Sequence, residues 1–258
     1  MGKRIIVGCP VSDYHLYCTD EYLNALKSLT YKDYDILLVD NSKEDTFFKD
    51  LIKKWINTAR ISFNENPRIR IVASRNILRQ KALEGNYDYF LSLEQDVIPP
   101  KNIIEMAMSH KKDILSGIYC GNIKIGDQVR ILPLVYKFPP ESRLNEAKQI
   151  IDNSNLKQLK AEMNSSYLDM VKAYYTIEEI EKEKSPTKVH SCGLGAVLIS
   201  RKVLEKIEFR YSEKYRGFDD VWFCEDAKEN GFEIYADPRI KCKHLIKNRG
   251  WHWKDLLK

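Results

Sequence analysis

Residues 87–96, Tyr-Asp-Tyr-Phe-Leu-Ser-Leu-Glu-Gln-Asp, decide how the fold of this chain is interpreted. The short apolar run is rich in aromatic side chains and is bounded by polar residues, which is typical of a strand inside a sheet. The run closes with Glu94 and Asp96, two acids that flank one residue where the backbone leaves the strand. The segment therefore predicts a strand over residues 87–93 with an acidic turn at its carboxyl end.

The same pattern of strand and helix repeats on the N-terminal side of this segment. Asp40 directly follows one of these strands, much as Asp96 follows residues 87–93. The alternation predicts an α/β fold with a mainly parallel sheet and helices on both faces. Because ligands bind beyond the carboxyl ends of strands in such sheets, we expect Asp40 and Asp96 to face the same crevice. Strands are predicted over residues 4–9, 35–40 and 69–73, and helices over residues 20–29, 46–57 and 75–83.

Two residues are expected to set boundaries in this first part of the chain. Pro10 ends the first strand, because proline has no N–H group with which to continue a central ladder. Ser74 is expected to cap the helix over residues 75–83.

The C-terminal side is less regular and contains an insertion. Residues 139–188 are rich in charge, lack glycine and carry apolar residues at helical spacing, which predicts an insertion of two or three amphipathic helices. The apolar positions are Leu144, Ala147, Ile151, Leu156, Leu159, Met163, Tyr167, Met170 and Tyr174. Strands are predicted over residues 114–119, 129–136, 196–200, 232–235 and 240–245, and helices over residues 201–207 and from Asp219 to near Gly231. The first two of these strands are split by Gly121 and Gly126, as in a hairpin, and residues 1–258 are predicted to form one domain.

Composition excludes several classes of protein. The 258 residues are 43% apolar and 31% charged, an ordinary globular mixture that is unlike disordered, collagen-like or disulfide-scaffold chains. The net charge of +5 is too small to indicate a dedicated nucleic-acid binder, although it suits a protein that handles phosphates. No apolar run approaches the roughly 18 residues of a membrane-spanning helix. Six scattered cysteines without a CxxC pair are typical of reduced thiols, so a cytoplasmic protein is expected.

Two constellations have the chemistry of a phosphate or metal site. Glu94 and Asp96 offer hard carboxylate oxygens, which suit Mg²⁺ or Mn²⁺ bound to phosphate, although a solvated acidic turn explains them equally well. His244 lies in the last predicted strand, and with an aspartate it would favour Mn²⁺. The basic residues around it could neutralise a diphosphate, form an exposed tail or touch anionic lipid at a membrane surface. They are Arg239, Lys241, Lys243, Lys247 and Arg249.

Two further features allow both a structural and a functional interpretation. Asp219 and Asp220 form a favourable helix start, and one of them could serve as a general base for a hydroxyl group. Gly193 and Gly195 lack the third glycine of a dinucleotide fingerprint, so they more plausibly let the backbone approach a substrate. The chain contains neither a Walker loop nor a GxSxG nucleophile elbow.

Taken in order, these segments resemble the nucleotide-sugar-dependent glycosyltransferases of the GT-A fold, and family 2 in particular. The resemblance covers residues 4–136 and 189–246. Residues 37–42 (Leu-Leu-Val-Asp-Asn-Ser) resemble the VVDDGS segment of that family, and residues 90–96 with Pro99 and Pro100 resemble its FLDxDxxxxP segment, the DxD motif. The further matches are residues 5–10 with the opening strand and base-binding loop, 74–87 with ARNxGLxxAxGEY, 193–199 with the acceptor-side segment, 218–231 with EDVDFCxRAxxxG, and 237–245 with the ending.

The resemblance implies a Rossmann-like GT-A fold and a metal-dependent glycosyltransferase (hexosyltransferase) that uses a UDP- or GDP-sugar. It implies Mn²⁺ or Mg²⁺ as cofactor, held by Asp96 and His244. Asp220, or Asp219, would be the catalytic base of an inverting enzyme, acting on a hydroxyl of an acceptor glycan, lipid or protein. The implied substrate-binding residues are Pro10, Asp40, Arg75, Glu94, Gln95, Gly193 and Gly195. Two alternatives remain open: a nucleotidyltransferase that makes sugar nucleotides, and a non-catalytic module that binds them.

Overall fold

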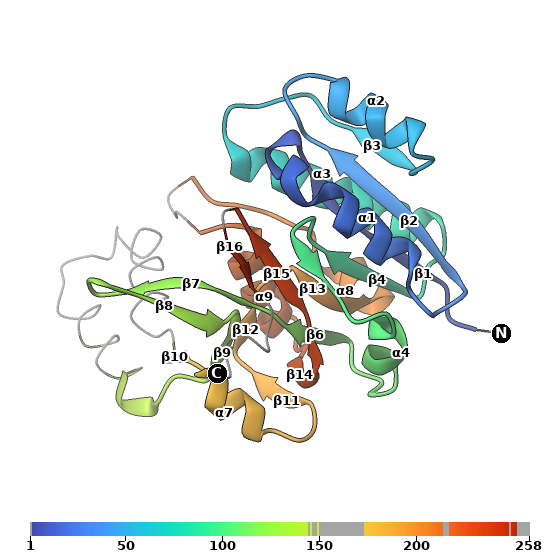
Figure 1. Ribbon diagram of the computed structural model, residues 1–258. Helices are drawn as coiled ribbons and strands as arrows, with labels where there is room; N and C mark the ends of the chain where they lie inside the picture. Colours follow the sequence, from blue (N-terminus) through green and yellow to red (C-terminus); the bar gives the residue numbers. More distant parts are fainter. Residues whose placement is uncertain are drawn as a thin grey trace.

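An eight-stranded sheet runs through the centre of the computed structural model, which describes residues 2–143, 145, 149, 173–213, 217–247 and 249–251 (Figure 1). The strand order is β11-β14-β6-β13-β4-β1-β2-β3. The run β4-β1-β2-β3 is parallel throughout, and β6 and β14 are also parallel, whereas β13 and β11 are antiparallel to their neighbours. The predicted α/β class with a mainly parallel sheet is therefore confirmed. The strands are β1 (Ile5–Val11), β2 (Tyr34–Asp40), β3 (Thr58–Arg60), β4 (Tyr89–Leu93), β6 (Ile114–Ile118), β11 (Thr187–Val189), β13 (Ala196–Ser200) and β14 (Ile234–Lys241).

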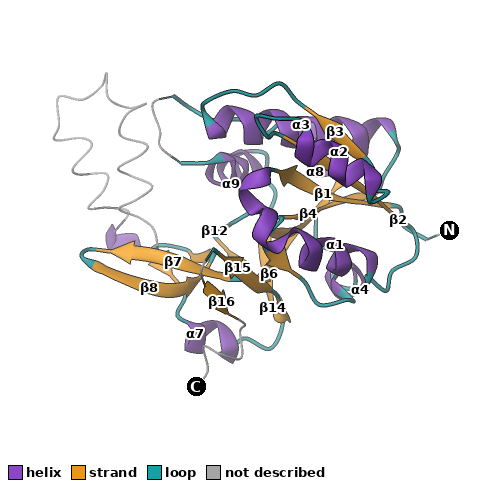
Figure 2. Cartoon of the chain, turned by 45° about the horizontal axis from the view of Figure 1, so that its top comes forward, coloured by secondary structure: helices purple, strands orange, loops and turns teal. Residues whose placement is uncertain are grey.

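Helices cover both faces of this sheet, as predicted. Successive strand residues point to opposite faces, so Ile6 and Phe90 pack into one core while Ile5 and Leu91 pack into the other. Figure 2 shows α1 and α4 on one side of the sheet and α3, α8 and α9 on the other. The helices are α1 (Thr19–Lys27), α2 (Thr46–Lys53), α3 (Pro67–Glu84), α4 (Ile103–Met108), α7 (Ile177–Lys182), α8 (Arg201–Lys206) and α9 (Asp219–Glu229), with a 3₁₀ helix η1 (Asp13–Cys18) after β1.

Short strands build a second layer beyond the C-terminal half of the central sheet. A hairpin of β7 and β8 turns at Gly126, whose φ of +59° is the left-handed conformation that favours glycine. The hairpin predicted between residues 114–119 and 129–136 is therefore wrong in its first strand, because β6 belongs to the central sheet and β8 pairs with residues 120–125. The predicted second strand divides into β8 and β9. The short strands are β5 (Val97–Ile98), β7 (Cys120–Ile125), β8 (Gln128–Pro133), β9 (Val135–Lys137), β10 (Ala173–Tyr174), β12 (Ser191–Cys192), β15 (Lys243–Ile246) and β16 (Arg249–Trp251).

The strand predicted over residues 69–73 is wrong, because these residues belong to helix α3. The helix begins at Pro67, a position that favours proline, and the side chain of Asn66 accepts a hydrogen bond of 3.0 Å from the Arg68 N–H. Ser74 is therefore inside the helix, where its hydroxyl donates to the carbonyl of Arg70, and it is not the cap. The third parallel strand is β3, at Thr58–Arg60.

Pro10 does not end the first strand, which continues to Val11. Beyond Gly8 the strand pairs with β2 and no longer with β4, so the missing N–H of Pro10 removes no bond from a two-sided ladder. The strand predicted over residues 232–235 starts later and is longer, since β14 runs from Ile234 to Lys241 with a register shift after Ala236.

Most of the insertion predicted over residues 139–188 lies outside the described residues. This applies to eight of its apolar positions: Leu144, Ala147, Ile151, Leu156, Leu159, Met163, Tyr167 and Met170. Tyr174 lies in β10 and not in a helix. Helix α7 at the end of the insertion is described, and Thr176 and Glu179 cap it reciprocally. Within the part of the chain that the structure describes, no helix combines the length and apolar character needed to cross a bilayer.

Candidate functional site at the carboxyl ends of the strands

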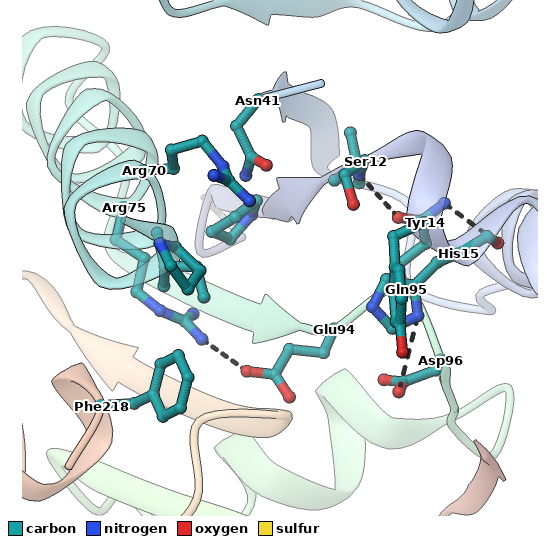
Figure 3. A pocket seen from close by; sticks show the side chains of 14 residues that line it. Ser12, Tyr14, His15, Asn41, Arg70, Arg75, Glu94, Gln95, Asp96 and Phe218 are labelled. Carbon is teal, nitrogen blue, oxygen red and sulfur yellow. Dashed lines mark hydrogen bonds and ion pairs between the residues drawn. The ribbon is translucent and has the colours of Figure 1, made fainter. Parts of the chain in front are cut away.

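A cavity of about 600 Å³ lies beyond the carboxyl ends of β1, β2 and β4 (Figure 3). Its position agrees with the rule that ligands of open α/β sheets bind at this edge. Helix α3 forms one wall, and the segment between β1 and α1 forms the opposite wall. The lining residues are Pro10, Val11, Ser12, Tyr14, His15, Asn41, Pro67, Arg70, Ile71, Arg75, Glu94, Gln95, Asp96 and Phe218.

Gln95 holds the segment after β1 in place. Its amide oxygen accepts a hydrogen bond of 3.0 Å from the Ser12 N–H, and its amide nitrogen donates to the Thr19 hydroxyl at 2.9 Å. The residue is only 3% exposed. Gln95 was predicted to bind substrate, but in the structure its polar atoms bind the chain itself, and their effect is to fix the loop that forms the cavity wall.

Asp96 and His244 lie together, as the sequence predicted. Strand β15 pairs with β5 so that His244 is opposite Val97, and the Leu245 N–H donates to the carbonyl of Asp96 at 2.7 Å. This register places Nε2 of His244 3.2 Å from Oδ2 of Asp96. His15 is a third member that the sequence analysis missed, with its Nδ1 3.8 Å from the same oxygen.

The geometry of His244 decides which nitrogen faces Asp96. Its Nδ1 lies 2.7 Å from the carbonyl oxygen of Cys120, so this nitrogen carries the proton that it donates. In the neutral ring, Nε2 then carries a lone pair that faces the Asp96 carboxylate oxygen. Because two acceptor atoms repel each other, this contact needs a proton or a cation between them. Burial disfavours a charged ring, but the hydrogen bond and charge of Asp96 outweigh it and raise the pKa of His244 above its ordinary value.

The side chains of Asp96 and His244 are of the types that bind a divalent cation. A carboxylate with an imidazole suits Mn²⁺ better than Mg²⁺. The hydrogen bond from Nδ1 to Cys120 is the kind of outer contact that orients a metal-binding histidine. Among the described residues, no group of three or more His, Cys, Asp or Glu side chains is already arranged as a metal site. A cation held by Asp96 and His244 therefore needs further oxygen ligands from a bound phosphate or from water.

Arg75 forms the centre of a buried charge cluster between β4 and α9. The side chain is 2% exposed, and its three nitrogens contact three different groups. One Nη donates to the Ser92 hydroxyl at 2.6 Å, the other forms an ion pair with Glu94 at 2.6 Å, and Nε lies 2.5 Å from Oδ2 of Asp219. Arg75 was predicted to bind the nucleotide. In the structure it lines the cavity, but its donors hold the two acids in place.

Glu94 lies in the wall of the cavity with 35% of its side chain exposed. Its removal from bulk water raises its pKa to about 7, with the charge of Arg75 opposing the rise and the charges of Asp96, Asp219 and Asp220 adding to it. Figure 3 shows its carboxylate reaching from the Asp96 side of the cavity toward Arg75 and Phe218.

A second cavity of about 210 Å³ adjoins the first. Ile71, Glu94 and Phe218 line both cavities and form the wall between them. The start of α9 supplies Asp219 and Asp220, of which Asp219 is 3% exposed and paired with Arg75, whereas Asp220 is half-buried. The remaining lining residues are Tyr119, Leu134, Tyr136, Gly193 and Leu194.

Gly193 and Gly195 make room for Tyr119. A Cβ atom at Gly193 would lie 2.4 Å from the Tyr119 hydroxyl, and one at Gly195 would lie 2.5 Å from Cζ of the same ring. The Gly195 N–H donates to that hydroxyl at 2.9 Å. These glycines were predicted to let the backbone approach a substrate. The structure instead shows them packed under a buried tyrosine, and Gly193 alone lines the second cavity.

Asp40 does not line either cavity. It is fully buried, and its carboxylate accepts hydrogen bonds from the N–H and hydroxyl of Ser42 and forms an ion pair of 3.1 Å with Arg60. Asn41, the next residue, lines the larger cavity together with Pro10. The sequence predicted the correct strand end, but the neighbouring amide reaches the cavity and the acid does not.

The basic residues around His244 are divided among several partners. Arg239 pairs with Asp237, Lys243 with Glu21 at 2.9 Å, and Lys241 with Glu181. The Nζ atom of Lys247 lies 5.4 Å from the centre of the Tyr14 ring, which lines the larger cavity. The side chain of Arg249 lies outside the described residues. The predicted basic cluster therefore does not form a single patch, and Lys247 is its member near the site.

His15, Tyr119 and Phe218 are among the site residues that the sequence analysis missed. Ligands of open α/β sheets bind beyond the carboxyl ends of the strands, and His15 lies in the segment that follows β1. This rule could therefore have predicted His15 as a site residue. Phe218 directly precedes Asp219, so the acidic pair at the start of α9 could have pointed to it. Tyr119 offered no local signal, because it packs against Gly193 and Gly195, which are distant in the sequence.

Comparisons with known proteins add little to this geometry. No protein-family model matches the chain, and no curated protein matches it either. Among solved structures, the chain is similar to A197 from STIV, with 19% identity, coverage of 95% of this chain and 87% of that chain, and a TM-score of 0.45.

Proposed function

We propose that this chain is a glycosyltransferase of the GT-A type that moves a sugar from a UDP- or GDP-sugar to an acceptor hydroxyl. One observation carries the proposal: Asp96, which contacts His244, lines the larger cavity, Asp220 lines the smaller one, and the two cavities share a wall. An inverting transferase needs this division, because in an in-line displacement the leaving group and the acceptor lie on opposite sides of the transferred sugar.

The larger cavity suits the nucleotide part of such a donor. It is lined by the loop after β1, by Asn41 after β2 and by the first turns of α3, and its volume lies in the usual range for small-molecule sites. Asp96 and His244 would hold a divalent cation against the diphosphate, and such a cation neutralises negative charge on the departing nucleoside diphosphate. Both residues lie beyond the carboxyl end of β4, where the diphosphate would meet the sugar.

Asp220 is the residue best placed to act as the base. Asp219 is buried against Arg75, so of the two acids Asp220 is the more accessible from the smaller cavity. In an inverting reaction, Asp220 takes the proton of the acceptor hydroxyl while that oxygen forms a bond to the anomeric carbon. The bond between this carbon and the diphosphate oxygen breaks, and the nucleoside diphosphate leaves with the electron pair.

The test measures binding and turnover separately. We expect UDP or GDP to bind in the presence of Mn²⁺ by calorimetry, and the matching sugar nucleotide to release its nucleoside diphosphate. Asp220→Asn should lower the rate by about 100-fold or more, because it removes a general base, with little change in donor affinity. Asp226→Asn is the matched control, since Asp226 lies on the same helix but pairs with Arg210 outside both cavities.

Three outcomes would contradict the proposal. Absence of binding by every UDP- and GDP-sugar would remove the donor site. Tight binding without turnover for any acceptor would indicate a non-catalytic module. Release of pyrophosphate from a nucleoside triphosphate and a sugar phosphate would indicate the nucleotidyltransferase.

A further inference from the structure

Trp55 occupies a backbone position that does not favour it. Helix α2 ends at Lys53, and the Trp55 N–H donates to the carbonyl of Ile52 at 2.9 Å. The next N–H, that of Ile56, donates to the carbonyl of Leu51 at 3.1 Å. This is the pattern of a Schellman motif, in which the residue at the place of Trp55 has left-handed backbone angles and is usually glycine. The φ of Trp55 is +61°, so its side chain costs free energy that glycine would avoid.

Burial does not offset this cost. Trp55 is 93% exposed, the largest exposed fraction among the exposed large apolar residues of the described chain. A tryptophan that is both strained and exposed stabilises the fold neither through its backbone nor through packing. Its indole ring is therefore available to a ligand.

An open cavity of about 600 Å³ lies beside Trp55, at the amino ends of β2, β3 and β4. Tyr34, the first residue of β2, lines this cavity, and Asn41, the residue after β2, lines the larger cavity described above. At about 3.3 Å per residue, β2 separates the two cavities by about 20 Å (Figure 1). The lining combines three aromatic rings with polar side chains. It consists of Lys27, Tyr34, Asp35, Ile36, Trp55, Ile56, Asn57 and Tyr87.

The polar groups of this cavity are held in place and can still bind a ligand. Oδ2 of Asp35 accepts a hydrogen bond of 2.6 Å from the Tyr87 hydroxyl and lies 3.4 Å from an Nη of Arg4. Among the described residues, Oδ1 of Asp35 has no hydrogen-bond partner, and neither has the side-chain amide of Asn57. The Tyr34 hydroxyl donates to a backbone carbonyl of α1 at 2.8 Å, which fixes its ring in the wall. A carboxylate oxygen and an amide are therefore open to a ligand beside the indole.

The charges at this edge of the sheet favour a neutral ligand. Within the lining, Lys27 and Asp35 balance each other. The lysines of α2 and its end, Lys49, Lys53 and Lys54, each form an ion pair with an aspartate, so they offer no unbalanced positive surface to an anionic lipid. A sugar ring has an apolar face of C–H groups and a rim of hydroxyls. It thus matches a wall that joins aromatic rings to hydrogen-bonding groups without net charge.

We propose that this cavity binds a sugar residue of a neutral glycan, with the indole of Trp55 against the C–H face of the sugar and with Asp35 and Asn57 hydrogen-bonded to its hydroxyls. A tryptophan ring supplies a large contact area and loses little conformational entropy on binding. Hydroxyl groups donate strong hydrogen bonds to a carboxylate. Because the site lies at the opposite edge of the sheet from the larger cavity, the proposal does not depend on the transferase function.

Neutral oligosaccharides test the proposal. Oligomers of glucose, galactose, mannose and N-acetylglucosamine are titrated into the full chain by calorimetry, with tryptophan emission recorded in parallel. We expect at least one to bind and to shift the emission to shorter wavelength, because the sugar displaces water from an exposed indole. Trp55→Ala should weaken this binding at least about tenfold, as expected for an aromatic anchor, and Asn57→Ala should weaken it several-fold. Phe138→Ala, at an exposed aromatic residue outside the cavity, should leave the affinity unchanged.

Trp55→Gly separates ligand binding from folding. Glycine adopts left-handed backbone angles without strain, so this variant should unfold at the same temperature as the unmodified protein or at a higher one. It should nevertheless lose oligosaccharide binding to the same extent as Trp55→Ala. A clear fall in the unfolding temperature of Trp55→Gly would show that the indole has a structural role, and the proposal would then lose its basis.

Three binding results would also overturn the proposal. The first is the absence of binding by every oligosaccharide. The second is equal binding by the unmodified protein and Trp55→Ala, which would place the sugar elsewhere on the chain. The third is binding to vesicles of phosphatidylcholine and phosphatidylglycerol that requires Trp55 while no oligosaccharide binds, which would assign the indole to a membrane surface. Each of these leaves the proposed transferase function in place, because nucleotide affinity is measured separately.

Discussion

Two strand ends in this molecule look alike in sequence and differ in their surroundings. Strands β2 and β4 flank β1 in the parallel part of the sheet, and acids stand at or just past both ends. At the end of β2, Asp40 is paired in register with Arg60 on β3, and it turns inward to that cation. Beyond the end of β4, Asp96 instead faces the imidazoles of His15 in η1 and His244 in β15. We propose that Asp40 is structural and Asp96 functional because of this difference in the groups beside them.

The start of α9 repeats this contrast within two adjacent residues. Asp219 is 3% exposed and lies against Arg75, whereas Asp220 is half-buried and lines the smaller cavity. Both acids line the smaller cavity, but the first is held by Arg75 and the second is the more exposed. Arg75 thus has the same relation to Asp219 that Arg60 has to Asp40.

The largest effect is expected from removing the cation that the buried acids share. Arg75→Met leaves Glu94 and Asp219 without their partner, and breaking a buried ion pair on one side costs about 3–5 kcal/mol. Urea unfolding measures this loss. Arg75→Lys keeps the charge but cannot reach Ser92, Glu94 and Asp219 together. The stability of this variant should therefore lie between that of the unmodified protein and that of Arg75→Met. If Arg75→Met lowers the free energy of unfolding by less than about 1 kcal/mol, Glu94 and Asp219 do not need Arg75 as a partner in the folded protein.

The two strand ends themselves provide the second test. Asp96→Asn should reduce turnover by about 100-fold, because it removes charge at the leaving group, while unfolding stays nearly unchanged. Asp40→Asn should do the opposite: it costs about 2 kcal/mol of stability through the lost charge-assisted bonds to Arg60 and Ser42, with nucleotide affinity preserved. Parallel measurements of unfolding, turnover and donor binding on both variants test these expectations. If the two variants lose affinity equally, the distinction between the strand ends fails.

The same contrast explains how much of the site could be predicted from the sequence. Apolar runs predicted β1, β2, β4 and β13 because these strands are buried on both faces, and the rule of strand ends then located the cavity. The fate of Asp40 could not be predicted, since it depends on a pairing with Arg60 twenty residues away. The convergence of Asp96 with His244 was predicted from the family resemblance, and not from spacing alone.

The failed strand over residues 69–73 has a local cause. Ile69, Ile71, Val72 and Ala73 look like a strand by composition, but they are half-buried in a helix whose start signal lies earlier, at Asn66 and Pro67. The role of the glycines was also out of reach, because the constraint on Gly193 and Gly195 comes from Tyr119, more than seventy residues away. Long-range packing of this kind leaves no periodic mark in the sequence.

Tyr119 allows a similar comparison at an uncharged part of the smaller cavity, where it packs against Gly193 and Gly195. Gly193→Ala should cost about 1–3 kcal/mol by overpacking, and Tyr119→Phe should recover much of it, because the hydroxyl is the atom that a Cβ would meet at 2.4 Å. Tyr119→Phe should not rescue Gly195→Ala, whose Cβ would lie 2.5 Å from Cζ, an atom that the phenylalanine keeps. Thermal unfolding of the three single variants and the two double variants measures both couplings. Equal rescue of the two alanines would contradict this account.

The smallest effect is expected at a third acid, which tests whether the behaviour of Asp40 is general. Asp237 is fully buried in β14, where Arg239 and His110 both face its carboxylate. Burial alone would raise the pKa of Asp237, but the hydrogen bonds and charge of Arg239, with His110, lower it overall. A carboxyl whose folded pKa is lowered stabilises the protein above its unfolded pKa of about 3.9, and this contribution is lost as the pH falls through the folded value. The difference in unfolding free energy between the unmodified protein and Asp237→Asn should thus be about 1 kcal/mol near pH 7 and should shrink below about pH 4. A difference that grows on acidification would show that the carboxylate is not held by its cations, and the pairing rule drawn from Asp40 would then apply to β2 alone.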